Sequence, residues 1–350
     1  MRLCIENKNR NIFLTLLLFL TAYAACSGGR FRDLDYEEVK HRWAENLEKN
    51  RAKYPDNFPW KHPEKRVFYQ SDFVVYMFSD QFAQGDAVYL EIVPGEKIED
   101  YKIFFNKREI LLTETAWGYK GLFGIEPNHP AGKAELEIAY EDFMQARRQS
   151  LPFDVKKKKF PVSKTLLKLG KYSDLSELRK PEVKKFIKEC LQKKKEAFSK
   201  SEENLLTSNF SHPLKNHVVT SEFWARRIKY KYDKARKKRK KQKNSTHKGL
   251  DLAGANGTPI FAVADGKVAL SEKMYFEGYY TLIDHGNKIY SGYMHQNKTY
   301  VEKDDTIEAG DKIGEVGSSG AVTGPHLHVF VMIQGVMVDP MSLLVLPYRE

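Results

Sequence analysis

The chain has 350 residues, which is enough for about two domains of typical size. Its hydrophobic content of 41% is sufficient for packed cores and argues against global disorder. The formal net charge of +12 is concentrated in residues 226–243, where twelve Lys or Arg and one Asp give +11, so the remainder is close to neutral (12 − 11 = +1). The charge therefore belongs to one segment, and together with the export signal described next it gives no reason to expect a nucleic-acid partner.

The amino terminus has the pattern of an export signal, with a basic head followed by a fourteen-residue apolar stretch at 12–25 that is too short to span a membrane. Two processing sites compete. Ala22-Tyr23-Ala24 fits ordinary signal peptidase, which would release a secreted protein. The alternative, residues 24–29, resembles a bacterial lipobox that would make Cys26 the lipidated first residue. We expect the lipid anchor at Cys26, holding the protein in the cell envelope, in the periplasm or at the outer membrane.

The composition of the remaining chain and the spacing of its apolar residues divide it into four segments. Residues 26–66 are charge-rich and predict a tether or helix. Short β-rich runs separated by Gly, Pro, Asp and Asn at 67–160 predict a β-sandwich of roughly ninety residues that resembles an Ig-like module. Residues 161–215 predict a helical connector with a helix starting at Pro181. Residues 216–350 form the last domain, so the expected fold is mainly antiparallel β with a helical connector.

Two short motifs in the last domain supply metal-ligand chemistry. His247-Lys-Gly-Leu-Asp251 carries an imidazole and a carboxylate at its two ends, and if this pentapeptide is extended both face one side, because alternate residues of a strand share a face. By the same parity, His326 and His328 of Gly-Pro-His-Leu-His point the same way, and parity does not tell which of them binds the metal. Two imidazoles and one carboxylate leave a fourth tetrahedral position for water, which is typical of a catalytic zinc site.

The surrounding sequence is similar to the lysostaphin-type (LytM-like) zinc metallo-endopeptidases, which cut peptide cross-links in bacterial cell walls. The similarity covers about residues 216–346 and rests on HKGLDLAGANGTPIFAVADGKV, YYTLIDHGNKIYSGYMHQ and AGDKIGEVGSSGAVTGPHLHVFV. It implies one zinc ion per chain held by His247, Asp251 and His328, with His295 and His326 as the catalytic pair.

Two departures from the family pattern bear on groove shape and substrate choice. Gln296 stands where an aliphatic residue is usual, and Trp224-Ala225 replaces a small Gly-containing step.

The expected function is zinc-dependent hydrolysis of peptidoglycan peptides by a monomer, with the two catalytic histidines moving protons. One rival is a non-catalytic envelope protein that activates other wall hydrolases or acts as an adhesin, although such relatives lose ligands and this chain retains them. Another is the same chemistry on a non-wall peptide. The basic segment is expected to be an extended arm that binds anionic wall material through Arg236, Lys237, Lys238, Arg239, Lys240 and Lys241.

Overall fold

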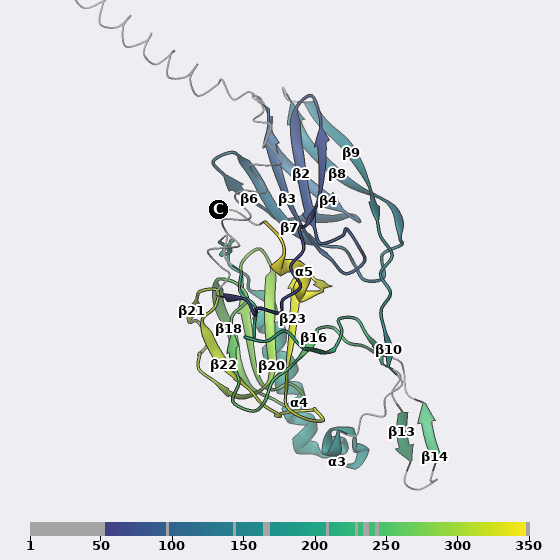
Figure 1. Ribbon diagram of the computed structural model, residues 1–350, viewed down its shortest axis with the longest axis vertical. Helices are drawn as coiled ribbons and strands as arrows, with labels where there is room; N and C mark the ends of the chain where they lie inside the picture. The colour runs from purple at the N-terminus through teal and green to yellow at the C-terminus, as the bar shows by residue number, and fades with distance from the viewer. Residues whose placement is uncertain are drawn as a thin grey trace, which may run out of the picture.

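The computed structural model describes residues 53–95, 98–142, 145–163, 169–207, 210–227, 230–233, 238–241 and 245–347 (Figure 1). The predicted export signal, Cys26 and most of the predicted tether lie outside the described residues. All named strand pairs but one are antiparallel, the exception being β10 with β12. The prediction of a mainly antiparallel β fold is therefore confirmed.

The first domain is a sandwich of two antiparallel sheets. One has the order β1 (Glu64–Tyr69), β2 (Phe73–Ser79), β3 (Ala87–Pro94), β7 (Gly118–Gly124) and β6 (Leu112–Thr115). The other has the order β5 (Arg108–Ile110), β4 (Ile98–Phe105), β8 (Gly132–Asp142) and β9 (Gln145–Val155). Alternate apolar residues of both sheets fill the space between them, including Val75, Leu90, Ile103, Ile138 and Phe153.

Strand β2 is buried on both faces along its whole length. Its odd-numbered residues, Phe73, Val75 and Met77, enter the sandwich core. Its even-numbered residues, Val74, Tyr76 and Phe78, join a second core that includes the last domain. A continuous apolar run such as FVVYMF is typical of a strand covered on both sides. The sandwich is therefore packed against the last domain through one of its sheets.

The connector begins with strand β10 (Val162–Ser163) and continues through the 3-10 turn η2 (Gly170–Ser173) and helices α3 (Leu175–Arg179) and α4 (Pro181–Ser199). The Asp174 side chain accepts a hydrogen bond from the Ser176 N–H at 2.9 Å and caps α3. Val183 and Cys190 are the buried residues of α4, whereas Phe186, expected on the same face, is 39% exposed. Residues 200–207 and 210–215 contain no helix, so the helical part of the connector ends at Ser199.

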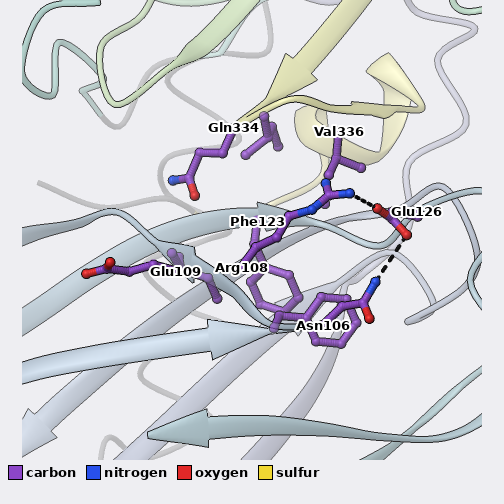
Figure 2. Close-up of a pocket in the computed structure, with 11 residues that line it drawn as sticks. Asn106, Arg108, Glu109, Phe123, Glu126, Gln334 and Val336 are labelled. Carbon is purple, nitrogen blue, oxygen red and sulfur yellow. Dashed lines mark hydrogen bonds and ion pairs between the residues drawn. The ribbon is translucent and has the colours of Figure 1, made fainter. Parts of the chain in front are cut away.

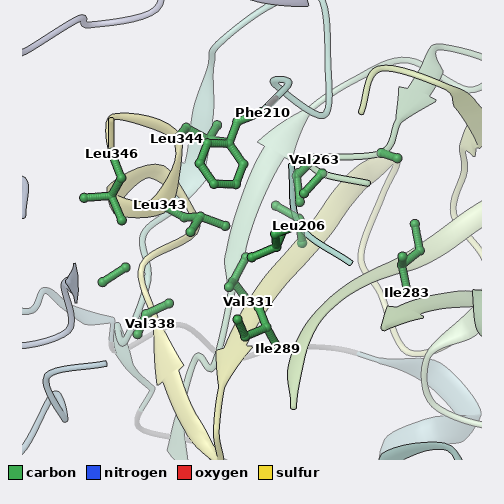
Figure 3. Packing of buried hydrophobic residues seen from close by; sticks show 14 of the residues in the cluster. Leu206, Phe210, Val263, Ile283, Ile289, Val331, Val338, Leu343, Leu344 and Leu346 are labelled. Carbon is green, nitrogen blue, oxygen red and sulfur yellow. The ribbon is translucent and has the colours of Figure 1, made fainter. Parts of the chain in front are cut away.

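The last domain is built on a ten-stranded antiparallel sheet. Its main path runs β11 (Val219–Ser221), β16 (Leu250–Ala253), β23 (His326–Ile333), β20 (Ile289–Thr299), β19 (Gly278–Asp284), β18 (Gly266–Met274) and β21 (Thr306–Ile307), with β17 (Pro259–Phe261), β22 (Lys312–Val316) and β24 (Val336–Val338) beside it. Helix α5 (Pro340–Leu344), capped by Asp339, packs with Val338 and Leu206 on one face (Figure 3). Helix α4 covers the opposite face.

The basic segment forms strands. It begins with β12 (Arg226–Arg227) and continues as an antiparallel ribbon of β13 (Tyr230–Asp233) and β14 (Lys238–Lys241), which Figure 1 shows projecting from the body of the molecule. Strand β15 (Ser245–Thr246) follows the basic segment and pairs with β12 immediately before His247. Lys238, Arg239, Lys240 and Lys241 form β14, whereas Arg236 and Lys237 lie outside the described residues.

The two domains meet along a tightly filled seam. In Figure 2, Gln334 and Val336 of the last domain face Phe123 and Arg108 of the sandwich across a pocket of about 20 Å³, which has room for about one water molecule. Gln334 Oε1 accepts a hydrogen bond from the Leu111 N–H at 3.2 Å. No helix in the described part of the chain is long and apolar enough to cross a membrane.

Candidate metal centre

Three predicted ligands converge at one end of the large sheet. Asp251 of β16 and His328 of β23 are direct cross-strand partners, and His247 precedes β16 in the chain. His247 Nε2 lies 2.9 Å from His328 Nδ1 and 2.9 Å from Asp251 Oδ1, and His328 Nδ1 lies 2.8 Å from the same oxygen. Within the described residues, this is the group of His, Cys, Asp or Glu side chains arranged to hold a metal ion.

The arrangement fits a zinc ion by the chemistry of its donors. Two imidazole nitrogens and a carboxylate oxygen are common zinc ligands, and bonds of about 2.0–2.2 Å put the ligand atoms of a tetrahedral site about 3.3 Å apart. The observed separations of 2.8–2.9 Å reach that spacing with side-chain shifts of a few tenths of an ångström. Three protein donors leave one tetrahedral position for water or substrate.

The His247 side chain is oriented by Ser221 and Glu222, which lie beside its ring. Its Nδ1–H donates to the Glu222 carbonyl at 2.9 Å, and the Ser221 hydroxyl lies 3.2 Å from the same nitrogen. This hydrogen bond fixes the tautomer and leaves the Nε2 lone pair directed at the cluster, which is the usual outer-shell arrangement of a metal-binding imidazole.

Gly249 is required by the close packing of His328. A Cβ at this position would lie 2.6 Å from His328 Nε2 and 2.5 Å from the Val329 carbonyl oxygen. Any larger residue would therefore displace the imidazole that faces Asp251. The central residue of the His247–Asp251 pentapeptide is glycine because His328 occupies the space of its side chain.

Asp251 is held as a carboxylate. Burial alone would raise its pKa, but hydrogen bonds and charge interactions with His247 and His328 outweigh burial and hold the pKa well below its usual range. The guanidinium of Arg227 donates to Asp251 Oδ2 at 3.0 Å and to Ser221 Oγ at 3.1 Å. Arg227 thus occupies one carboxylate oxygen while the other faces the imidazoles.

A β-bulge brings His295 to the site. The regular pairing of β19 with β20 is interrupted between Tyr293 and Gln296, and His295 has a φ of 64°. Without the bulge, His295 would share the face of Tyr293, which is completely buried in the core opposite α4. The bulge turns the ring toward the metal ligands, so that its centroid lies 5.1 Å from that of His326 and 6.0 Å from that of His328.

The two predicted catalytic histidines present equivalent nitrogens. His295 Nδ1–H donates to the Ser319 carbonyl at 3.0 Å, and His326 Nδ1–H donates to the Gly324 carbonyl at 2.9 Å. Each ring therefore leaves Nε2 available for proton transfer. Burial, followed by the charges of His328 and His326, lowers the pKa of His295 to about 3. Burial also lowers the pKa of His328, against the opposing effect of Asp251.

The structure therefore brings together all five predicted metal and catalytic residues, namely His247, Asp251, His295, His326 and His328. The two positions that depart from the family pattern, Gln296 and Trp224-Ala225, lie in different surroundings. The Gln296 side chain is completely buried and donates to Thr281 Oγ1 at 2.9 Å, so it lies in the core beside His295 and not on the surface of the site. Trp224 is half-buried and lies in the turn that contacts His247.

Arg227 and the backbone carbonyls of Glu222 and Ser319 were not predicted from the sequence to belong to the site. The only sequence signal for Arg227 was its place two residues after the Trp224-Ala225 departure. Arg227 lies at the start of the basic segment, so in the sequence it cannot be told apart from the other basic residues, although it hydrogen-bonds to Asp251. The carbonyl acceptors leave no sequence signal because every residue carries one.

Comparisons with known proteins agree with this geometry. Residues 245–340 match peptidase family M23. The peptidoglycan DD-endopeptidase ShyA of Vibrio cholerae is 34% identical over 116 residues, which cover 33% of this chain and 27% of ShyA. The DD-carboxypeptidase/endopeptidase Mpg of Neisseria meningitidis is 36% identical over 97 residues, which cover 28% of this chain and 22% of Mpg. The matches thus span about a quarter of these relatives.

The fold comparison extends beyond this domain. A solved structure described as a putative peptidase M23 from Pseudomonas aeruginosa aligns with a TM-score of 0.53 and 23% identity, covering 75% of this chain and 95% of that one. At this identity the likeness shows the fold alone. The peptidase class of the last domain rests instead on the family match at residues 245–340. Specifically, residues 245–340 are a LytM-type domain of peptidase family M23, which confirms the resemblance drawn from the motifs.

Proposed function

We propose that this protein is a zinc-dependent endopeptidase that hydrolyses peptide cross-links of bacterial peptidoglycan. The observation that carries the proposal is the convergence of His247, Asp251 and His328 beside the two imidazoles of His295 and His326. The M23 match and the names of the relatives, peptidoglycan endopeptidases, support this class of substrate.

A zinc ion bound by the three ligands would supply Lewis acidity, activating a water molecule and polarising the scissile carbonyl. The chain's own residues handle the protons. Because Nδ1 of His295 and of His326 is already engaged with a backbone carbonyl, Nε2 of a neutral ring is the proton acceptor, and after protonation it is the donor. A protonated ring can also donate to the oxyanion that forms on the substrate.

The rival reading, a non-catalytic envelope protein that activates other hydrolases or acts as an adhesin, needs no metal site. The complete ligand set favours the enzyme, because such a protein has no physical reason to keep two imidazoles and a carboxylate within 2.8–2.9 Å of one another.

Digestion of defined substrates tests the proposal. Purified protein is incubated with D,D-cross-linked muropeptide dimers, and products are followed by mass spectrometry with and without a chelator. The D,D cross-link comes first because the relatives are named DD-endopeptidases. We expect cleavage that the chelator stops and zinc restores. Asp251→Asn should be inactive, whereas Lys248→Ala, an exposed change between the ligands, should keep activity. A metal-loaded protein that stimulates a second hydrolase and cleaves no wall substrate would support the rival.

A further inference from the structure

The turn formed by residues 222–225, the cradle turn, holds His247 by three hydrogen bonds. Glu222 accepts from the His247 Nδ1–H at 2.9 Å through its carbonyl. The Trp224 N–H donates to the His247 carbonyl at 2.7 Å, and the His247 N–H donates to the Ala225 carbonyl at 2.9 Å. Both the position and the tautomer of this metal ligand thus depend on the conformation of the cradle turn.

The cradle turn is strained at its centre. Trp224 has a φ of 57°, in the left-handed region that favours glycine, and a non-glycine residue there costs on the order of 1–2 kcal/mol. Such a conformation persists only where the surrounding structure holds it in place. The support for the cradle turn must therefore come from residues outside it.

That support comes from the sandwich. Phe223 is 3% exposed, and a Cβ added to Gly85 would lie 2.8 Å from its ring. On another side the Phe223 ring meets Phe160 edge-on, with centroids 6.3 Å apart. Gly85 has a φ of +88° and accepts a hydrogen bond from the Asp339 N–H at 2.8 Å through its carbonyl. The backbone of the sandwich thus fills the space directly against the ring.

Neighbouring contacts fix this part of the seam. The Ala87 N–H donates to Ser342 Oγ at 2.9 Å. Lys158 Nζ lies 3.0 Å from Asp339 Oδ2 and 3.6 Å from Asp86 Oδ1, so one ammonium group bridges carboxylates of both domains. The two domains cannot separate here without breaking these bonds and moving Phe223.

We propose that the sandwich is a working part of the metal centre, in which Gly85 and Phe223 are positioning residues that hold the cradle turn and thereby His247. The inference rests on the proposed metal site. It means that the family domain at 245–340 does not contain everything its metal ligands need, because the cradle turn precedes residue 245 and its support lies in a separate domain.

Metal affinity of the full-length protein tests the proposal without reference to activity. In Gly85→Ala the new methyl group pushes Phe223 out of its site. We expect a loss of Zn²⁺ affinity, measured by chelator competition, on the order of 10–100-fold, as for other outer-shell changes. The absorption spectrum of bound Co²⁺ should also shift. Gly132→Ala is the matched control, because Gly132 also has a positive φ, +113°, but no atom within 4 Å of an added Cβ. It should bind metal as the parent does.

A second variant separates positioning from loss of folding. Phe223→Leu removes the ring, and should weaken metal binding several-fold on its own, while in the Gly85→Ala background it should recover part of the lost affinity by removing the clash. If Gly85→Ala does not fold, Phe223→Leu carries the test. Parent-like affinity in the folded variants would overturn the proposal. A parent protein that binds no metal would instead contradict the proposed function.

Discussion

Arg227 is the residue whose replacement tests most sharply how the ligands are held. It donates to Asp251 Oδ2 at 3.0 Å and to Ser221 Oγ at 3.1 Å, and Ser221 in turn lies 3.2 Å from His247 Nδ1. One guanidinium therefore contacts the outer side of Asp251 directly and reaches His247 through the Ser221 hydroxyl. Arg227→Gln removes the charge and the forked geometry, so the Asp251 carboxylate becomes free to rotate and both of its oxygens compete for water.

The expected loss can be bounded. Removing an outer-shell partner costs about 10–100-fold in metal affinity, equivalent to about 1.4–2.7 kcal/mol. The Arg227 side chain is 26% exposed, so water replaces part of what is lost. We therefore expect the lower part of that range, about ten- to thirtyfold, in Zn²⁺ affinity measured by chelator competition.

The control is Arg226→Gln, which makes the same charge change at the exposed neighbour in the same two-residue strand. It should leave metal affinity within about twofold of the parent, since exposed charges are screened. Equal losses of Zn²⁺ affinity in both variants would mean that Arg227 acts only through its positive charge, as any residue of the basic segment would. Unchanged affinity in Arg227→Gln would refute the reasoning altogether.

Four further predictions follow from the proposals and the structure. His295→Ala and His326→Ala should keep their metal and lose on the order of 10²–10⁴-fold in turnover, and a zinc-free variant would reassign that residue as a ligand. Burial raises the pKa of Asp86 to about 6, so the native state binds a proton more tightly at this carboxyl than the unfolded chain does. The resulting stabilisation is complete below about pH 4 and is lost as the pH rises through about 6. Between pH 4 and 7 the unfolding free energy of the parent should thus fall by about 2–3 kcal/mol relative to Asp86→Asn, and parallel curves in urea titrations would contradict this. Neutralising residues 236–241 should weaken binding to intact wall at low salt and spare cleavage of a small soluble peptide, whereas unchanged wall binding would show that these residues are merely solvated. Mass spectrometry of the mature protein should find lipid on Cys26, and an unmodified amino terminus at the preceding residue would indicate simple secretion.

Strand parity explains why part of the site was predictable. Asp251 and His328 lie on regular, directly paired strands, so their spacing in the sequence fixes the face to which they point. By contrast, the reason for Gly249 is a contact with His328, which is distant in the sequence, and only the structure shows it. The alternation of faces within each motif is encoded over a few residues, and the sequence therefore shows it.

Other features depend on long-range structure that no local pattern encodes. His295 faces the ligands only because a bulge interrupts β20, and parity alone would have placed it with Tyr293 in the core. The contact between Gly85 and Phe223 joins residues from two domains, and it becomes visible only when the domains are packed. The apolar run of β2 did carry a signal, since burial on both faces implies a second domain against the sandwich.

The central claim is that His247, Asp251 and His328 hold one catalytic zinc ion, and metal stoichiometry tests it most directly. Elemental analysis of the purified protein after dialysis against zinc-free buffer should find one zinc per chain. The His247→Ala, His328→Ala double variant, folded by circular dichroism, should contain none. Full stoichiometric zinc in that double variant would contradict the account.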